Sequence, residues 1–223
     1  MKNMHKYIDQ TILKPDVTRK DILEFLEGVK VYNFCAAVVN PCWVPMVSEQ
    51  LPGGTKLCSV IGFPLGASLT ETKVSAAELL VKLGCHEVDM VLNIGKLKDK
   101  DFKYVGKEIK AVAAACQGRI LKVIIETCLL DQDEKIAAAR IIQESGAHFV
   151  KTSTGFAREG ASTEDVRLLR SAVGPDFGIK ASGGIRTYAQ AVSFIEAGAD
   201  RLGTSSGVQI MKEAATAQTS KNT

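Results

Sequence analysis

The chain has 223 residues, of which 46% are hydrophobic and 24% charged, and its 28 Lys and Arg exceed its 25 Asp and Glu by three. These values are typical of a globular protein and exclude collagen-like and disordered chains. The net charge of +3 is small and no dense basic run is present, so nucleic acid is not expected as a partner. No apolar run reaches the roughly 18 residues of a membrane-spanning helix, so no membrane partner is expected either.

The cysteines and the N-terminal segment both bear on location. The six cysteines fall singly inside apolar segments without CxxC spacing, at Cys35, Cys42, Cys58, Cys85, Cys116 and Cys128. This pattern predicts small core residues in a reducing compartment and no metal site. The first ten residues lack the apolar stretch of a signal peptide, and we therefore expect a cytoplasmic protein.

Short apolar runs alternate with helical patterns along the whole chain. The predicted strands are 7–13, 34–39, 56–63, 86–93, 120–127, 148–154, 177–183 and 201–205. Between them, apolar residues recur at spacings of three and four, as at Ile22, Phe25, Leu26 and Val29, which predicts helices. Strands joined by helices are parallel, and apolar residues at both odd and even strand positions predict a sheet covered on both faces.

Several predicted helices have marked ends. Capping-box spacing occurs at Ser68–Glu71, Ser162–Asp165 and Thr187–Gln190, while Gly84, Gly146, Gly174 and Gly198 stand where helices need a left-handed residue. Three of these glycines also mark a repeated unit, because a distinctive strand residue follows five positions later at Asp89, Lys151 and Gly203. The repeat predicts that these three residues lie at equivalent depth along their strands.

Eight strand–helix units over about 215 residues give about 27 residues per unit, near the compact end of an eightfold βα barrel. No change of composition divides the chain. We therefore predict an α/β fold, a single (β/α)8 TIM barrel domain over residues 1–223, with a flexible tail from about residue 215. A doubly wound open sheet is the alternative, but residues 38–43 lack the G-x-G-x-x-G turn expected there.

In such a barrel, active-site residues lie at the carboxyl ends of the strands. Polar residues late in the predicted strands, or just after them, are Asp9, Asp89, Asn93, Lys122, Glu126, Lys151, Ser153, Lys180 and Ser182. Burial and a neighbouring cation should lower the pKa of both Lys151 and Lys180, which lie in consecutive apolar strands. A neutral amine can attack an aldehyde or ketone and form a Schiff base, which is an electron sink for cleaving or forming a C–C bond. Alternatively, each lysine points outward or pairs with a carboxylate.

Two glycine-containing loops predict a phosphate site. Residues 182–186, with sequence SGGIR, follow the strand of Lys180, and residues 203–208 follow the last strand and lead into a helix. Barrels of this kind bind phosphate after strands seven and eight, where backbone N–H groups are accessible. A phosphorylated substrate is therefore favoured over two simple turns. Arg186 either adds charge to this site or lies in solvent.

Asp89 lies within an apolar strand, so it must be paired or protonated. It is either a proton carrier or the partner of Lys122 in a structural ion pair. His5, His86 and His148 have no spacing for metal binding or a catalytic triad, and we expect them to be structural. No residue cluster predicts a metal ion, and an imine mechanism needs no cofactor.

Four segments resemble the motifs of the deoxyribose-phosphate aldolases: FVKTSTGF at 149–156, IKASGGI at 179–185, EVDMVLNIG at 87–95 and LKVIIET at 121–127. The resemblance extends from IDQTILKP at 8–15 to GTSS at 203–206. It implies a class I aldolase that reversibly cleaves 2-deoxy-D-ribose 5-phosphate into D-glyceraldehyde 3-phosphate and acetaldehyde.

The same resemblance implies roles for single residues. Lys151 resembles the Schiff-base lysine, Lys180 the second lysine that perturbs it, and Asp89 the acid/base aspartate. The substrate and its phosphate group would be bound by Gly155, Ser182, Gly183, Gly184, Gly203, Ser205 and Ser206. Some family members end in a tyrosine that enters the site, whereas this chain ends in AQTSKNT.

Two other functions share parts of this pattern. A phosphosugar isomerase or synthase barrel would use the phosphate loops with a carboxylate pair and no imine. A non-catalytic barrel could bind a phosphorylated metabolite with both lysines as counter-ions. The sequence leaves the oligomeric state open between a monomer, a homodimer and a larger homo-oligomer.

Overall fold

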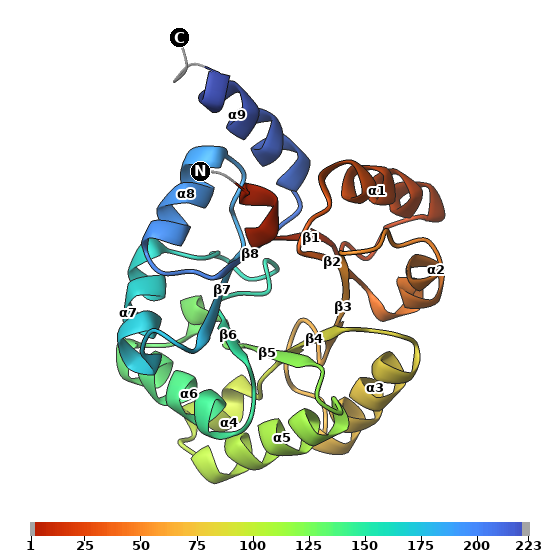
Figure 1. Ribbon diagram of the computed structural model, residues 1–223. Coiled ribbons are helices and arrows are strands. Elements are labelled where there is room, and N and C mark those ends of the chain that lie inside the picture. Colours follow the sequence, from red (N-terminus) through yellow and green to blue (C-terminus); the bar gives the residue numbers. More distant parts are fainter. Residues whose placement is uncertain (1–2, 220–223) are drawn as a thin grey trace.

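The computed structural model describes residues 3–219, which contain a closed barrel of eight parallel strands (Figure 1). Each strand pairs with its neighbours in sequence, and β1 pairs with β8 to close the ring. The strands are β1 (Ile8–Ile12), β2 (Ala36–Val39), β3 (Lys56–Ile61), β4 (Glu87–Val91), β5 (Ile120–Ile124), β6 (Phe149–Lys151), β7 (Gly178–Ser182) and β8 (Arg201–Thr204). The predicted (β/α)8 barrel is confirmed, and the open sheet is excluded.

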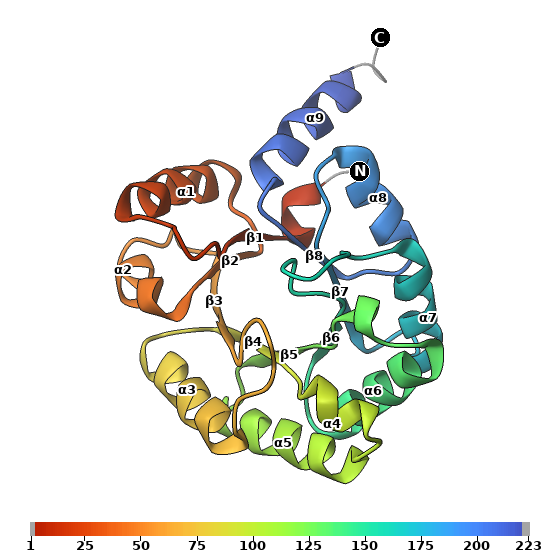
Figure 2. The ribbon, with the colours of Figure 1, turned by 180° about the vertical axis from the view of Figure 1, so that it is seen from behind.

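Helices surround the ring of strands in both views (Figures 1 and 2). They are α1 (Arg19–Tyr32), α2 (Val44–Ser48), α3 (Thr70–Lys82), α4 (Ile94–Lys98), α5 (Phe102–Ala115), α6 (Gln132–Glu144), α7 (Thr163–Val173), α8 (Tyr188–Glu196) and α9 (Gly207–Thr219). Short 3₁₀ helices are η1 (Met4–Tyr7), η2 (Pro41–Trp43) and η3 (Thr127–Leu129). Helix α9 includes residues 215–219, and the rest of the predicted tail, 220–223, lies outside the described residues.

The helices bury the faces that their apolar spacing predicts. In α1 the buried residues are Ile22, Phe25, Leu26 and Val29, all of them predicted from the sequence. Their side chains join one large core between the helices and the outer face of the barrel. Burying a side chain of this size is worth about 1.5–3 kcal/mol relative to leaving it in water, so this layer is the main driving force for closing the barrel.

Most helix ends follow the predicted signals, with one exception. Thr187 and Gln190 form a capping box, whereas at Ser162 only half of the predicted box is present, with the Ser162 side chain accepting a hydrogen bond from the N–H of Asp165. The predicted box at Ser68 is wrong, because α3 begins only at Thr70 and its N-cap residue, Leu69, has no capping side chain. The hydroxyl of Thr70 instead donates to the Tyr104 hydroxyl on α5, at 3.2 Å.

Every strand is shorter than the apolar run that predicted it, and the loss at the carboxyl end creates loops. After β5, Glu126 takes a left-handed conformation with φ of 53°, which ends the strand. After β6, residues 152–154 leave the sheet although they remain buried. These loops place polar groups at one end of the barrel, while the strands hold their position.

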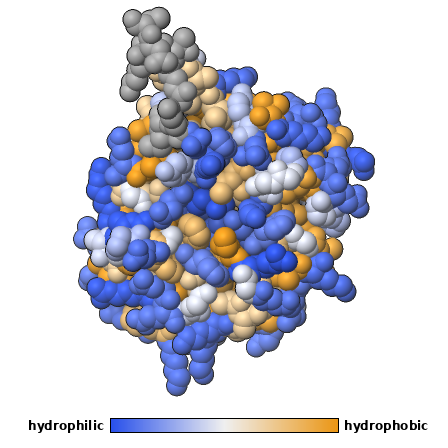
Figure 3. All heavy atoms as spheres, viewed as in Figure 1, coloured by the Kyte–Doolittle hydropathy of each residue, from blue (hydrophilic) through white to orange (hydrophobic). Residues whose placement is uncertain are grey.

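One face of the barrel is mostly hydrophilic (Figure 3), and the cysteines differ in their exposure. Hydrophilic residues cover most of the face in Figure 3, and hydrophobic residues form small separate groups. Cys58, Cys85 and Cys116 are buried as predicted, whereas Cys35 and Cys128 are half-buried and Cys42 is exposed, so the prediction is wrong for these three. Within residues 3–219, no helix combines the length and the apolar content needed to cross a lipid bilayer.

Candidate active site

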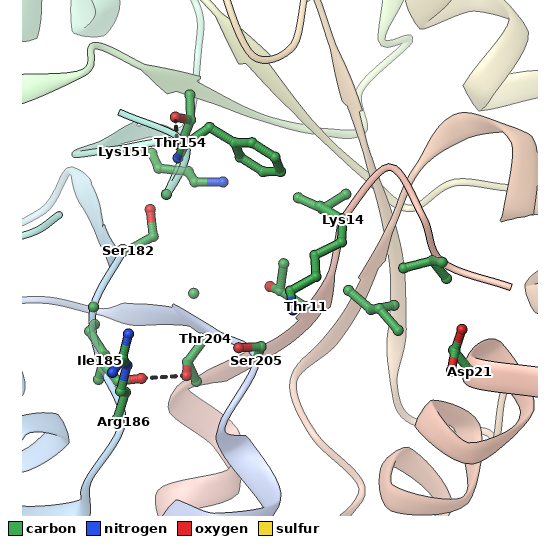
Figure 4. A pocket seen from close by; sticks show the side chains of 18 of the residues that line it. Thr11, Lys14, Asp21, Lys151, Thr154, Ser182, Ile185, Arg186, Thr204 and Ser205 are labelled. Carbon is green, nitrogen blue, oxygen red and sulfur yellow. Dashed lines mark hydrogen bonds between the residues drawn. The ribbon is translucent and has the colours of Figure 1, made fainter. Parts of the chain in front are cut away.

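A cavity of about 740 Å³ opens at the carboxyl ends of β1, β6, β7 and β8. Figure 4 shows Lys151 and Ser182 on one side of it, Thr204 and Ser205 at another, and Lys14 with Thr11 across from them. The cavity is lined by Thr11, Ile12, Leu13, Lys14, Asp16, Val17, Asp21, Lys151, Thr154, Gly155, Phe156, Ser182, Gly183, Gly184, Ile185, Arg186, Gly203, Thr204 and Ser205. The parallel strands bring these segments together because their carboxyl ends all meet at this end of the barrel.

Lys151 and Lys180 meet at a single carboxylate oxygen. The register of β6 and β7 places the two lysines opposite each other. Their Nζ atoms donate to the same oxygen of Asp89, Oδ2, at 2.7 Å from Lys151 and 2.8 Å from Lys180. Lys151 lines the cavity with 3% of its surface exposed, whereas Asp89 and Lys180 are fully buried behind it. The structure therefore unites the three residues that the sequence singled out.

The other oxygen of Asp89, Oδ1, is held by two further groups. It accepts from Lys122 Nζ at 2.8 Å and from the Cys58 thiol at 3.2 Å. Burial raises the pKa of the Cys58 thiol well above its ordinary value, so the thiol keeps its proton and donates it. The Asp89–Lys122 pair weighed from the sequence is present, and it coexists with the lysine pair on Oδ2.

Next to Asp89 lies a second group of buried ion pairs, formed by Asp9, Glu87 and Arg201 with the lysines, and the sequence analysis did not predict these pairs. Lys180 Nζ contacts Asp9 Oδ2 at 2.6 Å, and Arg201 donates from Nε to Asp9 Oδ1 at 2.6 Å. Arg201 and Lys122 both contact Glu87. Arg201 and Glu87 could have been found from the sequence, since each is a charged residue at the first position of a buried strand. Both lie at the amino end of the strands, where no active-site residue was sought.

These contacts set opposite proton affinities for the two lysines. Burial lowers the pKa of Lys151; Asp89 opposes this shift and the Lys180 ammonium adds to it. For Lys180, burial alone would lower the pKa, but the Asp89 and Asp9 carboxylates outweigh burial and raise it. The prediction that both amines lose proton affinity is thus right for Lys151 and wrong for Lys180, because Lys180 has a second carboxylate partner that Lys151 lacks.

Asp89 is an ionised carboxylate in this arrangement. Burial alone would raise its pKa, but the ammonium groups of Lys122, Lys151 and Lys180 hold it well below the ordinary value. Three cations around one carboxylate make Asp89 a poor base until one of them gives up its charge. Loss of the proton from Lys151 is such a change, so the protonation of Asp89 and of Lys151 is coupled through a single oxygen.

The two glycine loops expose backbone N–H groups to the cavity. Gly183 and Gly184 have φ of 92° and 79°, a conformation that few other residues adopt without strain. Within residues 3–219, no hydrogen bond takes up the N–H groups of Gly184, Ile185 and Ser205. Neighbouring N–H groups of this kind form an anion-binding concavity.

The predicted binding residues divide into two groups. Gly155, Ser182, Gly183, Gly184, Gly203 and Ser205 all line the cavity. Ser206 does not, and its N–H is already bonded to the Thr204 hydroxyl at 2.9 Å. The next N–H, of Gly207, donates to Gln10 Oε1 at 2.9 Å, so both of these N–H groups are already used within the protein.

Two glycines allow neighbouring segments to pack closely because they have no side chain. A Cβ atom at Gly203 would lie 2.8 Å from the Cβ of Ser182 and 3.0 Å from Cε of Lys180. The loop after β6 also packs directly on the loop after β7, because a Cβ at Gly160 would lie 2.2 Å from the Gly183 carbonyl oxygen. That oxygen accepts from the N–H of Ala161 at 3.1 Å. The two loops therefore contact each other through their backbones.

Glu126, a candidate from the sequence, supports another wall of the cavity together with Phe63 and Phe156, which the sequence did not indicate. The buried Glu126 carboxylate accepts from the hydroxyl and the N–H of Thr154, and the Thr154 hydroxyl accepts from the N–H of Phe156 at 3.0 Å. Phe156 then packs edge-on against Phe63, with ring centroids 5.3 Å apart. The cavity thus has an apolar wall facing the polar loops.

The remaining polar candidates have structural contacts. Asn93 caps α4 by accepting from the N–H of Lys96, at 3.1 Å. Ser153 is buried beside the loop of Gly183 and does not line the cavity. His86 and His148 each accept, at 3.1 Å, the N–H of a residue at the start of a neighbouring strand. Their predicted structural role is confirmed.

Comparison with known proteins identifies the family. The family model described as "DeoC/LacD family aldolase" matches residues 3–213. The chain belongs to this family of aldolases. The deoxyribose-phosphate aldolase of Streptococcus sanguinis is 51% identical over 210 residues, which cover 94% of this chain and 96% of the relative. The deoxyribose-phosphate aldolase of Bacillus cytotoxicus is 49% identical over 211 residues, which cover 94% and 95%.

Solved structures of aldolases share the barrel. A structure described as "QR15, an Aldolase" superimposes with a TM-score of 0.93 at 42% identity and covers 97% of both chains. The deoxyribose phosphate aldolase of Aeropyrum pernix, described as having a unique tetrameric structure, gives a TM-score of 0.86 at 35% identity and covers 94% of this chain and 89% of that one. This member of the DeoC/LacD family is therefore an aldolase, a carbon–carbon lyase.

Proposed function

We propose that this aldolase reversibly cleaves 2-deoxy-D-ribose 5-phosphate into D-glyceraldehyde 3-phosphate and acetaldehyde, with Lys151 as the Schiff-base lysine. The observation that carries the proposal is the Lys151–Asp89–Lys180 contact at the wall of a cavity that also exposes anion-binding N–H groups. The relatives at about half identity bear the name of this activity. No metal or cofactor is needed for the chemistry that follows.

The first stage joins the substrate to the enzyme. The neutral Lys151 amine attacks the C1 aldehyde of the open-chain sugar and gives a carbinolamine. Lys180, an ammonium, protonates the departing hydroxyl group through the shared Asp89 oxygen or a water, and loss of water gives the iminium. The lowered pKa of Lys151 supplies the neutral amine, and the raised pKa of Lys180 keeps the proton donor charged.

The second stage breaks the bond between C2 and C3, because acetaldehyde retains C1 and C2. A base removes the proton of the C3 hydroxyl group, C3 becomes the aldehyde carbon of glyceraldehyde 3-phosphate, and the bonding electrons move to C2 to give an enamine. Asp89 is the base, and it gains proton affinity as the bonding electrons reach the iminium nitrogen, because enamine formation neutralises the Lys151 cation that otherwise holds the Asp89 pKa low. Protonation of C2 and addition of water to the imine then release acetaldehyde.

The isomerase or synthase alternative needs a pair of carboxylates facing substrate. The residues that line the cavity include Asp16 and Asp21, but the Asp21 carboxylate caps α1 through Thr18, accepting at 2.7 Å from the N–H. Asp9 and Glu87 are buried in ion pairs behind Lys180. The positions of the lysines therefore favour an imine mechanism over a carboxylate pair. A protein that only binds the sugar would not need the contact between Lys151 and Asp89.

Borohydride trapping tests the proposal. Enzyme is incubated with deoxyribose 5-phosphate or acetaldehyde, reduced, digested and examined by mass spectrometry. We expect an adduct on the peptide that contains Lys151, none in the Lys151→Ala variant, and none on the peptide of Lys73, a buried lysine outside the cavity. Absence of an adduct, or an adduct elsewhere that survives Lys151→Ala, would overturn the mechanism.

The proposal extends to assembly and location. We propose a homo-oligomer, supported by the relative described as tetrameric, and light scattering of the purified protein would measure its mass. A cytoplasmic location is supported by the three buried thiols, Cys58, Cys85 and Cys116, which fit a reducing compartment.

A further inference from the structure

The charged residues that line the cavity differ in whether they already have partners. Lys151 is bonded to Asp89, and Asp21 accepts from the N–H and the hydroxyl of Thr18. In the part of the chain that the structure describes, the side chains of Lys14 and Arg186 have neither a hydrogen bond nor an ion pair. Two lining cations are therefore available to a ligand.

These two cations approach from opposite sides. Arg186 belongs to the loop after β7, next to the free N–H groups of Gly184 and Ile185. Lys14 belongs to the loop after β1, and Figure 4 shows its side chain pointing into the cavity across from Arg186. Ser205, with its own free N–H, lies on the wall between them.

The backbone of Lys14 is held in place by a neighbouring strand. Asn40, which follows β2, donates from its side chain to the carbonyl oxygen of Leu13 at 3.0 Å and to that of Lys14 at 3.5 Å. The N–H of Val17 closes a turn on the Lys14 carbonyl at 3.4 Å, and Pro15 restricts the intervening residue. The position of the Lys14 backbone at the rim of the cavity is thus fixed by contacts with the segment after β2.

A phosphate monoester carries nearly two negative charges at neutral pH. Free N–H groups and one guanidinium offer one full positive charge, so a second cation is needed to balance the ligand. We infer that Lys14 supplies that second charge and is a specificity-determining residue for phosphorylated over unphosphorylated sugars. This inference rests on the proposed function and adds to it a residue outside the glycine loops.

The test compares two substrates in two variants. In Lys14→Met, kcat/KM for deoxyribose 5-phosphate should fall about 10-fold, mainly through KM, as for loss of one charged hydrogen bond from an exposed lysine. For unphosphorylated deoxyribose, kcat/KM should change less than about 2-fold. Lys20→Met, which removes an exposed lysine of α1 outside the cavity, should leave both substrates unchanged. An equal fall for both substrates, or no fall, would overturn the inference.

Calorimetry with inorganic phosphate separates this inference from the proposed function. Phosphate should bind the wild-type protein more tightly than Lys14→Met, and this holds whether or not the enzyme cleaves deoxyribose 5-phosphate. If the wild-type enzyme does not cleave the sugar but phosphate binding still depends on Lys14, the proposed function fails and the site stands. Equal phosphate binding by the two proteins would overturn the role of Lys14.

Discussion

Two lysines of this chain are almost equally buried yet differ in their contacts. Lys73 and Lys151 are 1% and 3% exposed, and burial lowers the pKa of both. Lys73, on α3, donates to the Gly66 and Val91 carbonyls at 2.8 and 2.9 Å and to Glu108 at 2.9 Å. Lys151 donates to Asp89 alone among the described residues and faces a cavity.

The difference shows what distinguishes a reactive amine from a structural one. An ammonium has three donors, and the contacts of Lys73 use all of them, which ties the loop after β3 to β4 and α5. Lys151 has unused donors, a neighbouring cation and access to a ligand. Burial and a lowered pKa are common to both residues, so neither property alone marks a catalytic lysine.

The largest effect is expected at Lys151. Lys151→Met should reduce aldol cleavage by about 10⁴-fold or more, since it removes the nucleophile. The fold should persist, because Asp89 keeps Lys122 and Lys180 as partners. A coupled assay for glyceraldehyde 3-phosphate and circular dichroism measure the two properties. Substantial residual cleavage in the folded variant would contradict the contrast with Lys73.

The reverse outcome is expected at Lys73. Lys73→Met leaves the buried Glu108 carboxylate without its cation and should lower the free energy of unfolding by about 3–5 kcal/mol. Urea denaturation measures this change. At low temperature the folded fraction should keep kcat, because no atom of Lys73 reaches the cavity. The double variant Lys73→Met/Glu108→Leu should recover much of the lost stability, and a failure to do so would show that the carbonyl contacts dominate.

The smallest effect concerns pH. Lys180→Met removes a cation that lowers the pKa of Lys151 and leaves Asp89, which raises it, so the pKa of Lys151 should rise. Imine formation needs the unprotonated amine, and the acidic limb of its pH profile should therefore move to higher pH. The rate of borohydride trapping at a series of pH values measures the shift. Lys135→Met, which breaks a distant pair with Asp165, is the control, and a profile unchanged in Lys180→Met would refute the proposed coupling.

The sequence predicted the barrel because each strand and helix is encoded locally. Apolar periodicity and glycine spacing identified all eight strands, but not the residue at which each strand ends. Those ends depend on backbone conformations such as the left-handed one of Glu126, and the spacing of apolar residues carries no information about them. The candidate site was predicted where charged residues interrupt apolar strands, as Asp89, Lys151 and Lys180 do.

One error of the sequence analysis and two residues that it did not single out depend on partners distant in the chain. The raised pKa of Lys180 depends on Asp9, which lies on the strand that closes the barrel. Lys73 has the sequence context of an exposed helix residue, and only the packing of α3 on α5 buries it. Lys14 enters the cavity because Asn40 fixes its loop. Each of these contacts joins segments that are distant in the sequence and is not encoded by a local motif.

The backbone contact between Gly160 and Gly183 has a consequence for which sugars can react. It joins the loop after β6, the strand of Lys151, to the loop after β7 with the free N–H groups, so the two loops are held at a fixed separation. In the proposed reaction, this fixed distance limits the number of carbon atoms between the carbonyl group and the phosphate of a substrate. A sugar phosphate with one carbon more or fewer would place either its carbonyl or its phosphate out of position, so the barrel would select length before stereochemistry.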